Sequence, residues 1–520
     1  MVKINKVSKN FLLLVFIVGT ILRLYKWNSY GLCYDESMWL NRLFLPKRNF
    51  LELFTNTVWI AKPPFFRFLL YLWKFLAKDE FTLRLLPFTF GILSILLTYK
   101  LGKILFDEKI AFIATFLLTI SPFHIYYSQE LTHYTLTLFL VLCSVYYFLF
   151  GLEQNRLPIW IKFIFFTILS LYTSYISVFL VIFENIFFFL LYKKHKALLK
   201  RWLIVQLIIL LLYSPWLILL PKQFKVISLY PTYFTWIPKG SLLHILQTLR
   251  IFSIGYNANF LITLFTSLIF YSFLILAIYH GFKNAPYKTN FLILWLFLPM
   301  ILSILFSNIV STFTYRNFFI SLPAFLILIA YGISKIKRIN YIIMLLFFIM
   351  FLSGLALFNY YQNIYPYPSD FYRPGVHPKR ESREAAYYII NNLKDGDVVF
   401  HTCPGTASPF IYYLLISGQK EKLYNWPKYL LSEKNNKEFV PWSYGLVIEN
   451  IEELSKFIKD ENRRIWLVLS FWEPNFLDQH PFSEPNKIKR LMDRQFILKG
   501  YKEFTGIKVY LYEIPDKFWP

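Results

Sequence analysis

Two adjacent carboxylates, Asp35 and Glu36, follow the first apolar stretch of a chain that is poor in acids. The 520 residues include only 30 Asp and Glu against 55 Lys and Arg. A carboxylate that is partly desolvated beside a membrane can act as a general base and take a proton from an attacking group. A solvated acidic loop at the membrane surface would show the same pair. The spacing alone leaves both interpretations open.

A third acid, Glu130, stands between two apolar stretches and is flanked by Tyr126, Tyr127 and Tyr134. It could face Asp35 across a cavity and bind a hydroxyl-bearing ligand. A divalent ion is the other candidate ligand, and Asp35 and Glu130 would then be its carboxylate ligands. An acid favoured by the dipole at a helix start is the structural alternative.

Three basic residues could bind a phosphate group. Lys62 precedes Pro63 and Pro64, which fix an extended backbone and so give the lysine a defined direction. Arg316 stands alone at the start of an apolar stretch, where a guanidinium can make a bidentate phosphate contact. Arg84 begins another apolar stretch and has the same choice of roles. Binding of ordinary lipid phosphate is the alternative for all three.

The elements that must position these residues are membrane helices. The chain is 57% hydrophobic and 16% charged, whereas a soluble domain carries roughly a quarter charged residues. Apolar runs of about twenty residues are long enough to cross a bilayer. We expect a polytopic α-helical membrane protein with about eleven transmembrane helices. The expected spans are 11–25, 81–106, 110–127, 131–150, two within 159–192, 202–220, 260–280, 289–308, 318–331 and 339–361.

Basic residues predict the orientation of these spans. The net charge is +25, but the basic residues form no single patch interleaved with aromatics, so nucleic-acid binding is not indicated. Many lie in short loops on one side of the apolar runs, as at 193–201 and 335–338. Positive loops face the cytoplasm. We therefore expect a multi-pass plasma-membrane protein with a cytoplasmic N-terminus and an extracytoplasmic C-terminus.

The composition changes near residue 365, where several prolines form a linker. We assign 1–364 to a transmembrane domain, with the acidic pair in an outer loop at 27–80, and 365–520 to an extracytoplasmic α/β domain. An amphipathic helix is expected at 38–45. In the second domain we expect strands at 397–401 and 465–470, a hairpin turning at Thr505-Gly506, and helices at 382–393, 451–458 and 486–493. We expect this domain to shape access of the acceptor.

Several motifs are missing from the sequence. No GxxxxGK[ST] motif is present, which argues against an ATP-driven pump. No Cys/His cluster indicates a metal site. No GxGxxG follows a strand, and the α/β domain is expected outside, away from cytoplasmic nucleotide sugars. Any sugar donor would therefore be linked to a lipid.

Five stretches resemble a known family when they are taken together and in order. They are Tyr34-Asp35-Glu36, Lys62-Pro63-Pro64, 81–87, 121–130 and 315–323. The chain from roughly residue 11 to 332 resembles the GT-C superfamily of polyprenyl-phosphate-sugar glycosyltransferases. The most similar branch contains the protein O-mannosyltransferases and the lipid A aminoarabinose transferases, glycosyltransferase family 39.

This resemblance implies roles for the residues. Asp35 would be the catalytic base with Glu36 beside it, and Glu130 the second acid of the active cavity. Lys62 and Arg316 would hold the phosphate of the donor. Two positions depart from the family. Thr132 stands where many relatives have arginine. Ala61 stands where the aminoarabinose branch has glutamate, which weakens the case for the metal site and acceptor of that branch.

The expectation is an integral membrane glycosyltransferase that inverts the anomeric centre. It would move a hexose or pentose from a polyprenyl-phosphate-linked donor to a lipid, glycan or protein acceptor on the extracytoplasmic face. The rival from another class is a polytopic transporter or lipid flippase without transferase activity. A transporter predicts charged residues or broken helices near the middle of the bilayer. The candidate residues stand at the expected outer ends instead.

Overall fold

The chain divides by its contacts into two units. The computed structural model describes residues 6–44, 62–77, 79–191, 196–223, 239–307, 313–366, 379–401, 404–418, 463–470 and 485–515. The helical unit comprises Met1–Trp27 and Phe54–Val376, and the carboxyl-terminal unit comprises Asn28–Leu53 and His377–Pro520. The segment that carries Asp35 and Glu36 thus groups with the second unit.

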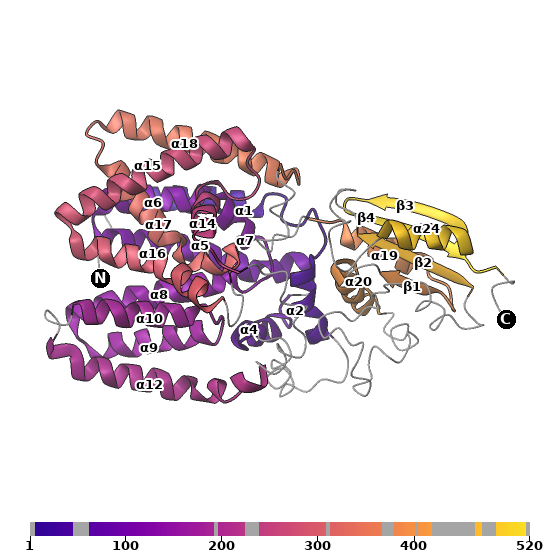
Figure 1. The fold of residues 1–520 in the computed structure, drawn as a ribbon, viewed down its shortest axis with the longest axis horizontal. Coiled ribbons are helices and arrows are strands. Elements are labelled where there is room, and N and C mark those ends of the chain that lie inside the picture. The colour runs from indigo at the N-terminus through magenta and orange to yellow at the C-terminus, as the bar shows by residue number, and fades with distance from the viewer. Residues whose placement is uncertain are drawn as a thin grey trace. The chain divides into compact units, whose positions relative to one another are not determined.

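The helical unit is built of α-helices that run side by side (Figure 1). Its elements are α1 (Lys6–Leu24), α4 (Phe65–Trp73), α5 (Glu80–Leu105), α6 (Glu108–Ile120), α7 (Pro122–Ser128), α8 (Tyr134–Gln154), α9 (Leu157–Leu171), α10 (Ser177–Leu190), η2 (Lys196–Leu198), α12 (Leu199–Leu217), α14 (Leu242–Ile254), α15 (Phe260–Asn284), α16 (Pro286–Phe306), η4 (Tyr315–Ser321), α17 (Leu322–Ser334) and α18 (Ile339–Tyr361).

The predicted polytopic helical fold is confirmed. Among the described residues, seven helices are long and apolar enough to cross a membrane, and an eighth span is formed if the bent pair α6 and α7 counts as one. Each of the eleven predicted spans falls on helical structure, although the span predicted at 110–127 is divided between α6 and α7. The predicted pair within 159–192 is shorter than a full span, because α9 and α10 have 15 and 14 residues.

Helix α17 forms the centre of the helical unit. Every residue from Leu322 to Ile333 is buried. A helix that is apolar all round is expected to be surrounded by other elements. Gly332 lets α15 approach, because a Cβ there would lie 2.2 Å from the carbonyl oxygen of Phe273. Helices α6, α15 and α16 therefore pack around α17.

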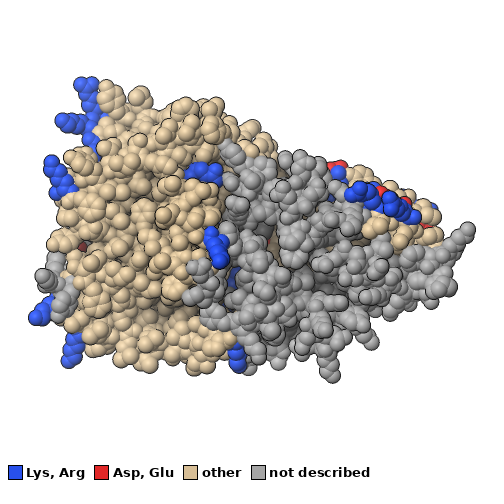
Figure 2. Space-filling view, viewed as in Figure 1, with Lys and Arg blue, Asp and Glu red and all other residues tan. Residues whose placement is uncertain are grey.

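Lysine and arginine gather at one end of the helical unit (Figure 2). Lys103, near the end of α5, pairs with Glu108 at 3.3 Å, at the start of α6. Lys109 Nζ donates to the carbonyl of Ser334 at the end of α17, at 3.2 Å. The end of α5, the start of α6 and the end of α17 therefore meet. Positive residues at one end of a bundle are the pattern of a cytoplasmic face.

The carboxyl-terminal unit contains a four-stranded sheet in the order β1-β2-β4-β3. The strands are β1 (Val398–His401), β2 (Arg464–Ser470), β3 (Ile497–Phe504) and β4 (Ile507–Glu513). Strands β1 and β2 are parallel, and β4 is antiparallel to both β2 and β3. The predicted strands and the hairpin are confirmed. Gly506 has φ 76° in the hairpin turn, where glycine carries no Cβ penalty.

Helices α19 (Ser382–Asn392), α20 (Pro404–Ile416) and α24 (Pro485–Gln495) accompany the sheet. Helices α19 and α24 were predicted, whereas α20 was missed. Pro404 stands at the first position of α20, where proline is tolerated, and Pro409 lies inside the helix. The helix predicted at 451–458 lies outside the described residues.

The acidic pair stands in a helix rather than in a loop. The sequence predicted an amphipathic helix at 38–45, but α2 spans Tyr34–Phe44, so Asp35 and Glu36 lie in its first turn. Acidic residues in the first turn are favoured by the helix dipole. The predicted outer loop at 27–80 also contains α4, at Phe65–Trp73.

Candidate active site

A broken helix leads to Glu130. The sequence predicted one span at 110–127, but α6 and α7 are bent by 60° at Ser121-Pro122. The residue before a proline is driven out of the helical region, and Ser121 has φ −63° and ψ 116°. Its Oγ caps α7 by accepting from the His124 N–H at 3.3 Å. The break leaves carbonyls at the end of α6 without helical partners.

Arg23 of α1 binds those carbonyls. Its guanidinium donates to the carbonyl oxygens of Thr119 and Leu118 at 3.1 and 3.3 Å. It also contacts His124 Nδ1 at 2.8 Å and Ser128 Oγ at 3.3 Å, so it binds both halves of the broken helix. Arg23 is fully buried. Its role was missed, although a single arginine near the end of an apolar span is a signal because burying that charge is costly.

Gln129 fixes the turn that carries Glu130. Its Nε2 donates to the carbonyl of Arg23, near the end of α1, and to the carbonyl of Tyr25, just beyond that end, both at 2.9 Å. Its Oε1 accepts from the Tyr360 hydroxyl of α18 at 2.7 Å. All these groups belong to the helical unit. The turn is therefore joined to two helices, and Glu130 has a defined position.

Glu130 lies among buried aromatic and basic side chains. Its own side chain is 7% exposed. The hydroxyl of Tyr127 is in electrostatic range of both Glu130 and Arg316. The hydroxyl of Tyr360 is in range of both Glu130 and Arg84. One acid and two arginines that were singled out from the sequence therefore share one neighbourhood in the helical unit.

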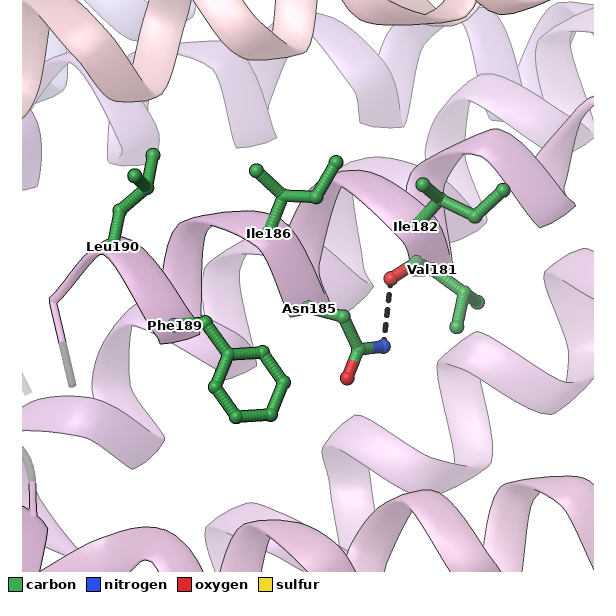
Figure 3. Close-up of a pocket in the computed structure, with 6 residues that line it drawn as sticks. All are labelled: Val181, Ile182, Asn185, Ile186, Phe189 and Leu190. Carbon is green, nitrogen blue, oxygen red and sulfur yellow. Dashed lines mark hydrogen bonds between the residues drawn. The ribbon is translucent and has the colours of Figure 1, made fainter.

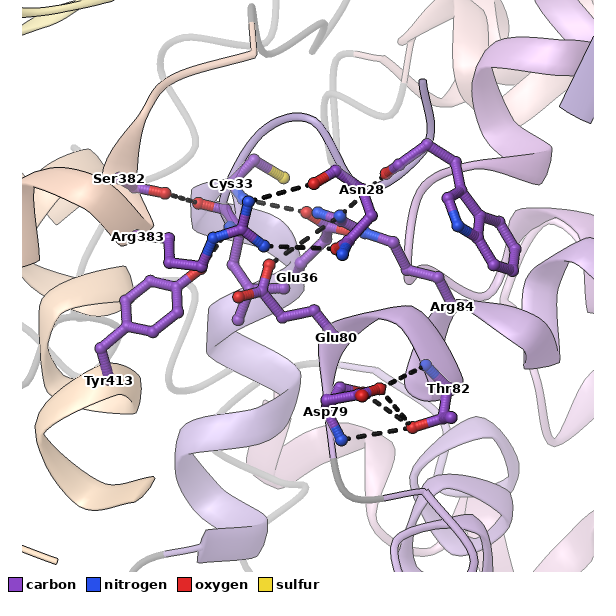
Figure 4. A network of polar contacts seen from close by, with 12 residues as sticks. Asn28, Cys33, Glu36, Asp79, Glu80, Thr82, Arg84, Ser382, Arg383 and Tyr413 are labelled. Atoms are coloured by element: carbon purple, nitrogen blue, oxygen red, sulfur yellow. Dashed lines mark hydrogen bonds and ion pairs between the residues drawn. The ribbon is translucent and has the colours of Figure 1, made fainter. Parts of the chain in front are cut away.

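The two arginines make different contacts. The Arg316 guanidinium lies 5.5 Å from the centre of the Tyr134 ring, a cation–π distance. Arg84 Nη1 donates to the Trp27 carbonyl at 3.0 Å and lies 3.9 Å from Glu80 (Figure 4). Arg84 therefore also joins α5 to the turn after α1, a structural task beyond the one expected from the sequence.

Lys62 is half-buried and precedes the start of α4. Pro63 and Pro64 behind it are buried, and Phe65 N–H donates to the Tyr172 carbonyl at 2.8 Å. The proline pair is thus tied to the turn between α9 and α10. This supports the expectation that the backbone at Lys62 has a fixed direction.

The acidic pair in the carboxyl-terminal unit is buried as well. Asp35 is 6% exposed and Glu36 is 3% exposed. Glu36 Oε2 accepts from the backbone N–H of Cys33 at 2.9 Å, the contact that a third-position Glu makes in a capping box. Glu36 therefore stabilises the start of α2. The motif Cys33-x-x-Glu36 was the signal that could have placed the helix start correctly.

Three helical segments carry a candidate residue at one end and a lysine at the other. Arg84 and Lys103 are nineteen residues apart on α5, which corresponds to about 28 Å along a helix. The α6–α7 pair has Lys109 in its first turn and leads to Glu130, and the η4–α17 segment has Arg316 in its first turn and ends next to Lys335. Arg84, Glu130 and Arg316 therefore lie at the end of the helical unit opposite Lys103, Lys109 and Lys335.

A cavity of about 610 Å³ lies along α10 in the helical unit (Figure 3). It is lined by Val181, Ile182, Asn185, Ile186, Phe189 and Leu190. Asn185 Nδ2 donates to the carbonyl of Val181 and to Gln206. None of the candidate residues lines this cavity, and its walls offer hydrocarbon rather than an acid or a base.

One further acid lies inside a membrane helix. Glu184 of α10 is fully buried, and its Oε1 accepts from Ser144 Oγ of α8 at 2.9 Å. Ser144 is joined to Thr167 of α9 at 2.8 Å, so the contact links three helices. The sequence reasoning did not single out Glu184. Among the described residues, no group of three or more His, Cys, Asp and Glu could hold a metal ion.

Comparisons with known proteins agree with this architecture. Residues 61–219 match the family model of the dolichyl-phosphate-mannose-protein mannosyltransferases. The structure of ArnT from Cupriavidus metallidurans bound to undecaprenyl phosphate aligns with a TM-score of 0.60 at 12% identity, covering 97% of this chain and 98% of ArnT. The oligosaccharyltransferase AglB from Archaeoglobus fulgidus, in complex with an inhibitory peptide and a dolichol-phosphate, aligns with a TM-score of 0.55 at 12% identity, covering 98% and 74%.

No curated protein sequence matches the chain. The family model covers the segment that contains Lys62, Arg84 and Glu130. The structural alignments cover nearly the whole chain and show the fold. The chain therefore has the fold of these solved structures, and its residues 61–219 are similar to the dolichyl-phosphate-mannose-protein mannosyltransferase family.

Proposed function

We propose that the protein transfers a sugar from a polyprenyl-phosphate-linked donor to a lipid, glycan or protein acceptor on the extracytoplasmic face of the plasma membrane. The observation that carries the proposal is the neighbourhood of Glu130, Arg84 and Arg316 at the end opposite the lysines. Lysines at the other end indicate that the buried charges lie at the extracytoplasmic side. The solved GT-C structures with undecaprenyl phosphate and dolichol-phosphate support this class of donor.

The transfer is proposed as a direct displacement. The acceptor forms a bond to the anomeric carbon while the bond from that carbon to the phosphate oxygen breaks, so the configuration inverts. The acceptor gives its proton to Asp35, and polyprenyl phosphate leaves with the electron pair. Asp35 is buried at the start of α2, as expected of a carboxylate that serves as a base.

Lys62, Arg84 and Arg316 are proposed to stabilise the phosphate as its charge grows. Fixed cations aimed at a developing charge contribute more in a water-poor site than in solution. Arg316 is 7% exposed and Arg84 is 4% exposed, so both are removed from bulk water. Glu130 is proposed to bind hydroxyls of the acceptor or the sugar. A divalent ion held by Asp35 and Glu130 stays a prediction from the sequence.

The test compares envelope molecules from cells that make the wild-type chain, Asp35→Asn or Asp79→Asn. Asp79 is the matched control because it only caps α5, accepting from the Thr82 N–H at 2.7 Å, and asparagine also serves as an N-cap. Mass spectrometry of lipids, glycans and exported proteins should show a species heavier by one sugar. We expect it with the wild type and Asp79→Asn and at background level with Asp35→Asn.

Protein levels in the membrane fraction provide the control for expression. The same sugar-bearing species at wild-type level with Asp35→Asn would remove Asp35 from its proposed role. If the protein is a transporter or lipid flippase without transferase activity, none of the three strains should contain the species that is heavier by one sugar. Glu36→Gln separates the two acids, because the amide oxygen can still accept from Cys33, and we expect it to retain most of the product.

A further inference from the structure

The segment before the acidic pair is clamped by the carboxyl-terminal domain (Figure 4). The N–H of Leu32 donates to the Tyr413 hydroxyl of α20 at 2.9 Å. The carbonyl of Leu32 accepts from Ser382 Oγ of α19 at 2.7 Å. Both backbone groups of this buried residue are therefore bound by helices that stand more than 340 positions later in the sequence. All these residues belong to one unit.

The clamp is a close fit at Gly31. A Cβ at this position would lie 2.4 Å from the Arg383 backbone nitrogen and from Ser382 Oγ, and 2.8 Å from the Tyr413 hydroxyl. Only glycine fits such an approach without displacing backbone atoms. Arg383 extends the contact, because its Nη2 donates to the Asn28 carbonyl at 3.0 Å. The stretch that leads into α2 is therefore fixed residue by residue.

A second contact fixes the rotation of α2. Ser37 and Asn41 are one helical turn apart, share a face and are both fully buried. Ser37 Oγ lies 2.8 Å from Ser408 Oγ, and Asn41 Nδ2 donates to the Ser408 carbonyl at 2.9 Å. Asp35 precedes Ser37 by two residues and is about 200° away around the helix axis. With this face held against α20, Asp35 is directed away from α20.

We propose that the carboxyl-terminal α/β domain is the frame that positions Asp35 for proton transfer, and that Tyr413 and Ser408 are positioning residues for this step. The inference rests on the proposed function of Asp35. Proton abstraction needs the base within hydrogen-bond distance of the proton it takes. A displacement of about 1 Å at a reacting group can cost about a hundredfold in rate. In this proposal the domain contributes to catalysis by positioning Asp35, in addition to shaping access of the acceptor.

The experiment compares Tyr413→Phe with Tyr512→Phe in the full-length enzyme. Both tyrosines are fully buried in the same unit and hydrogen-bond through the hydroxyl. The Tyr413 hydroxyl accepts from the Leu32 N–H, whereas the Tyr512 hydroxyl donates to Asp493 of α24 at 2.7 Å. The donor probe is undecaprenyl-phosphate mannose, and the acceptor is the species that gains the sugar in the envelope comparison. Initial rates give kcat and the KM for the donor, and thermal unfolding gives stability.

We expect Tyr413→Phe to lower kcat about tenfold and to leave the donor KM within about twofold, because one clamp contact is lost while the phosphate-binding residues are untouched. Tyr512→Phe should keep kcat within about twofold at a similar loss of thermal stability. Ser408→Ala should act as Tyr413→Phe does. Equal losses of kcat in Tyr413→Phe and Tyr512→Phe would assign the effect to stability and overturn the inference.

A disulfide provides the measurement that does not depend on a loss of activity. The Ser37 and Ser408 oxygens are 2.8 Å apart, so Ser37→Cys with Ser408→Cys should oxidise readily in a chain whose three native cysteines are replaced by alanine. We expect the linked enzyme to keep at least half the rate of its reduced form. Failure to link, or a linked form that is inactive until reduced, overturns the inference.

Different results would overturn the proposed function of Asp35 and the positioning role of the carboxyl-terminal domain. Wild-type kcat in both Tyr413→Phe and Ser408→Ala, with Asp35→Asn inactive, would overturn the positioning role alone. Activity in Asp35→Asn would overturn the proposed function, and with it the reason for positioning this helix.

Discussion

In the helical unit, Glu130 follows a broken helix whose open carbonyls are bound by a buried arginine. In the carboxyl-terminal unit, Asp35 stands in the first turn of an intact helix held by neutral hydroxyl and amide groups. The first arrangement depends on Arg23, which contacts two carbonyls of α6 and two side chains of α7. The second depends on Tyr413, Ser382 and Ser408. The two candidate acids are thus placed by different physical means.

The difference predicts different consequences of mutation. Removing a buried arginine leaves several carbonyls without donors, and each unsatisfied group costs about 1–3 kcal/mol. Removing one hydroxyl from the clamp on α2 leaves a single backbone group without its partner. The helical unit should therefore unfold when the Arg23 contacts are removed. The carboxyl-terminal unit should stay folded when one hydroxyl is removed, but it should hold Asp35 less accurately.

The largest expected effect is that of Arg23→Met. The side chain keeps its apolar volume but loses every donor to Leu118, Thr119 and the α7 side chains. We expect a loss of roughly 3 kcal/mol or more. Little monodisperse protein should be recovered in detergent, and the midpoint of thermal unfolding should fall by many degrees. Arg338→Met is the matched control, because Arg338 is exposed at the start of α18. Equal behaviour of the two variants would contradict the role of Arg23.

A smaller effect is expected from Gln129→Met. The variant removes the contacts with the Arg23 and Tyr25 carbonyls and with the Tyr360 hydroxyl, but it leaves the break between α6 and α7 bound by Arg23. The folded protein should therefore be recovered, while the turn that carries Glu130 loosens. We expect kcat with undecaprenyl-phosphate mannose to fall about tenfold to a hundredfold.

The control for Gln129→Met is Gln206→Met. Gln206 also accepts a side-chain hydrogen bond between helices, from Asn185 at 3.0 Å, but this contact joins α10 to α12 and not to the turn that carries Glu130. The Gln206→Met variant should keep wild-type kcat. If Gln129→Met also kept wild-type kcat, the placement of Glu130 by this turn would be excluded.

The sequence predicted the elements better than it predicted what holds the acids. Long apolar runs have one stable solution in a bilayer, so the spans from α1 to α18 could be read from composition and length. The hairpin at Thr505-Gly506 has a local turn signal and was also found. The start of α2 was misplaced because Glu36 was weighed as a catalytic group, although it also completes a capping contact with Cys33.

Contacts between segments far apart in the sequence could not be predicted. Arg23 and Ser128 are 105 positions apart, and Leu32 and Tyr413 are 381 apart. A single sequence contains no signal that pairs a particular serine or tyrosine with a distant backbone group. The break at Ser121-Pro122 was readable from the proline rule, but the apolar residues on both sides favoured one continuous span.

The smallest expected effect concerns pH and the sheet of the carboxyl-terminal unit. His401, at the end of β1, is 2% exposed, and burial lowers the pKa of its imidazole to about 3. In the unfolded chain the pKa of histidine is about 6.5. As the pH falls from about 6.5 towards 3, His401 therefore binds a proton in the unfolded chain but not in the folded unit. Stability is complete above the unfolded pKa and declines below it, by about 2 kcal/mol at pH 5.

His401→Asn should remove this decline, because asparagine can keep the contact with Thr406 Oγ1, 3.1 Å from His401 Nδ1, without titrating. Hydrogen exchange of the β1 and β2 amides in the full-length protein, compared between variants at the same pH, measures the effect. The ratio of wild-type to variant exchange should rise as the pH goes from 7 to 5. Thr406→Val loses the same contact but keeps the imidazole, so its ratio to wild type should stay constant with pH. A constant ratio for His401→Asn would show that this histidine titrates alike in the folded and unfolded chain. The acid sensitivity of the unit that holds Asp35 would then have to arise from other groups.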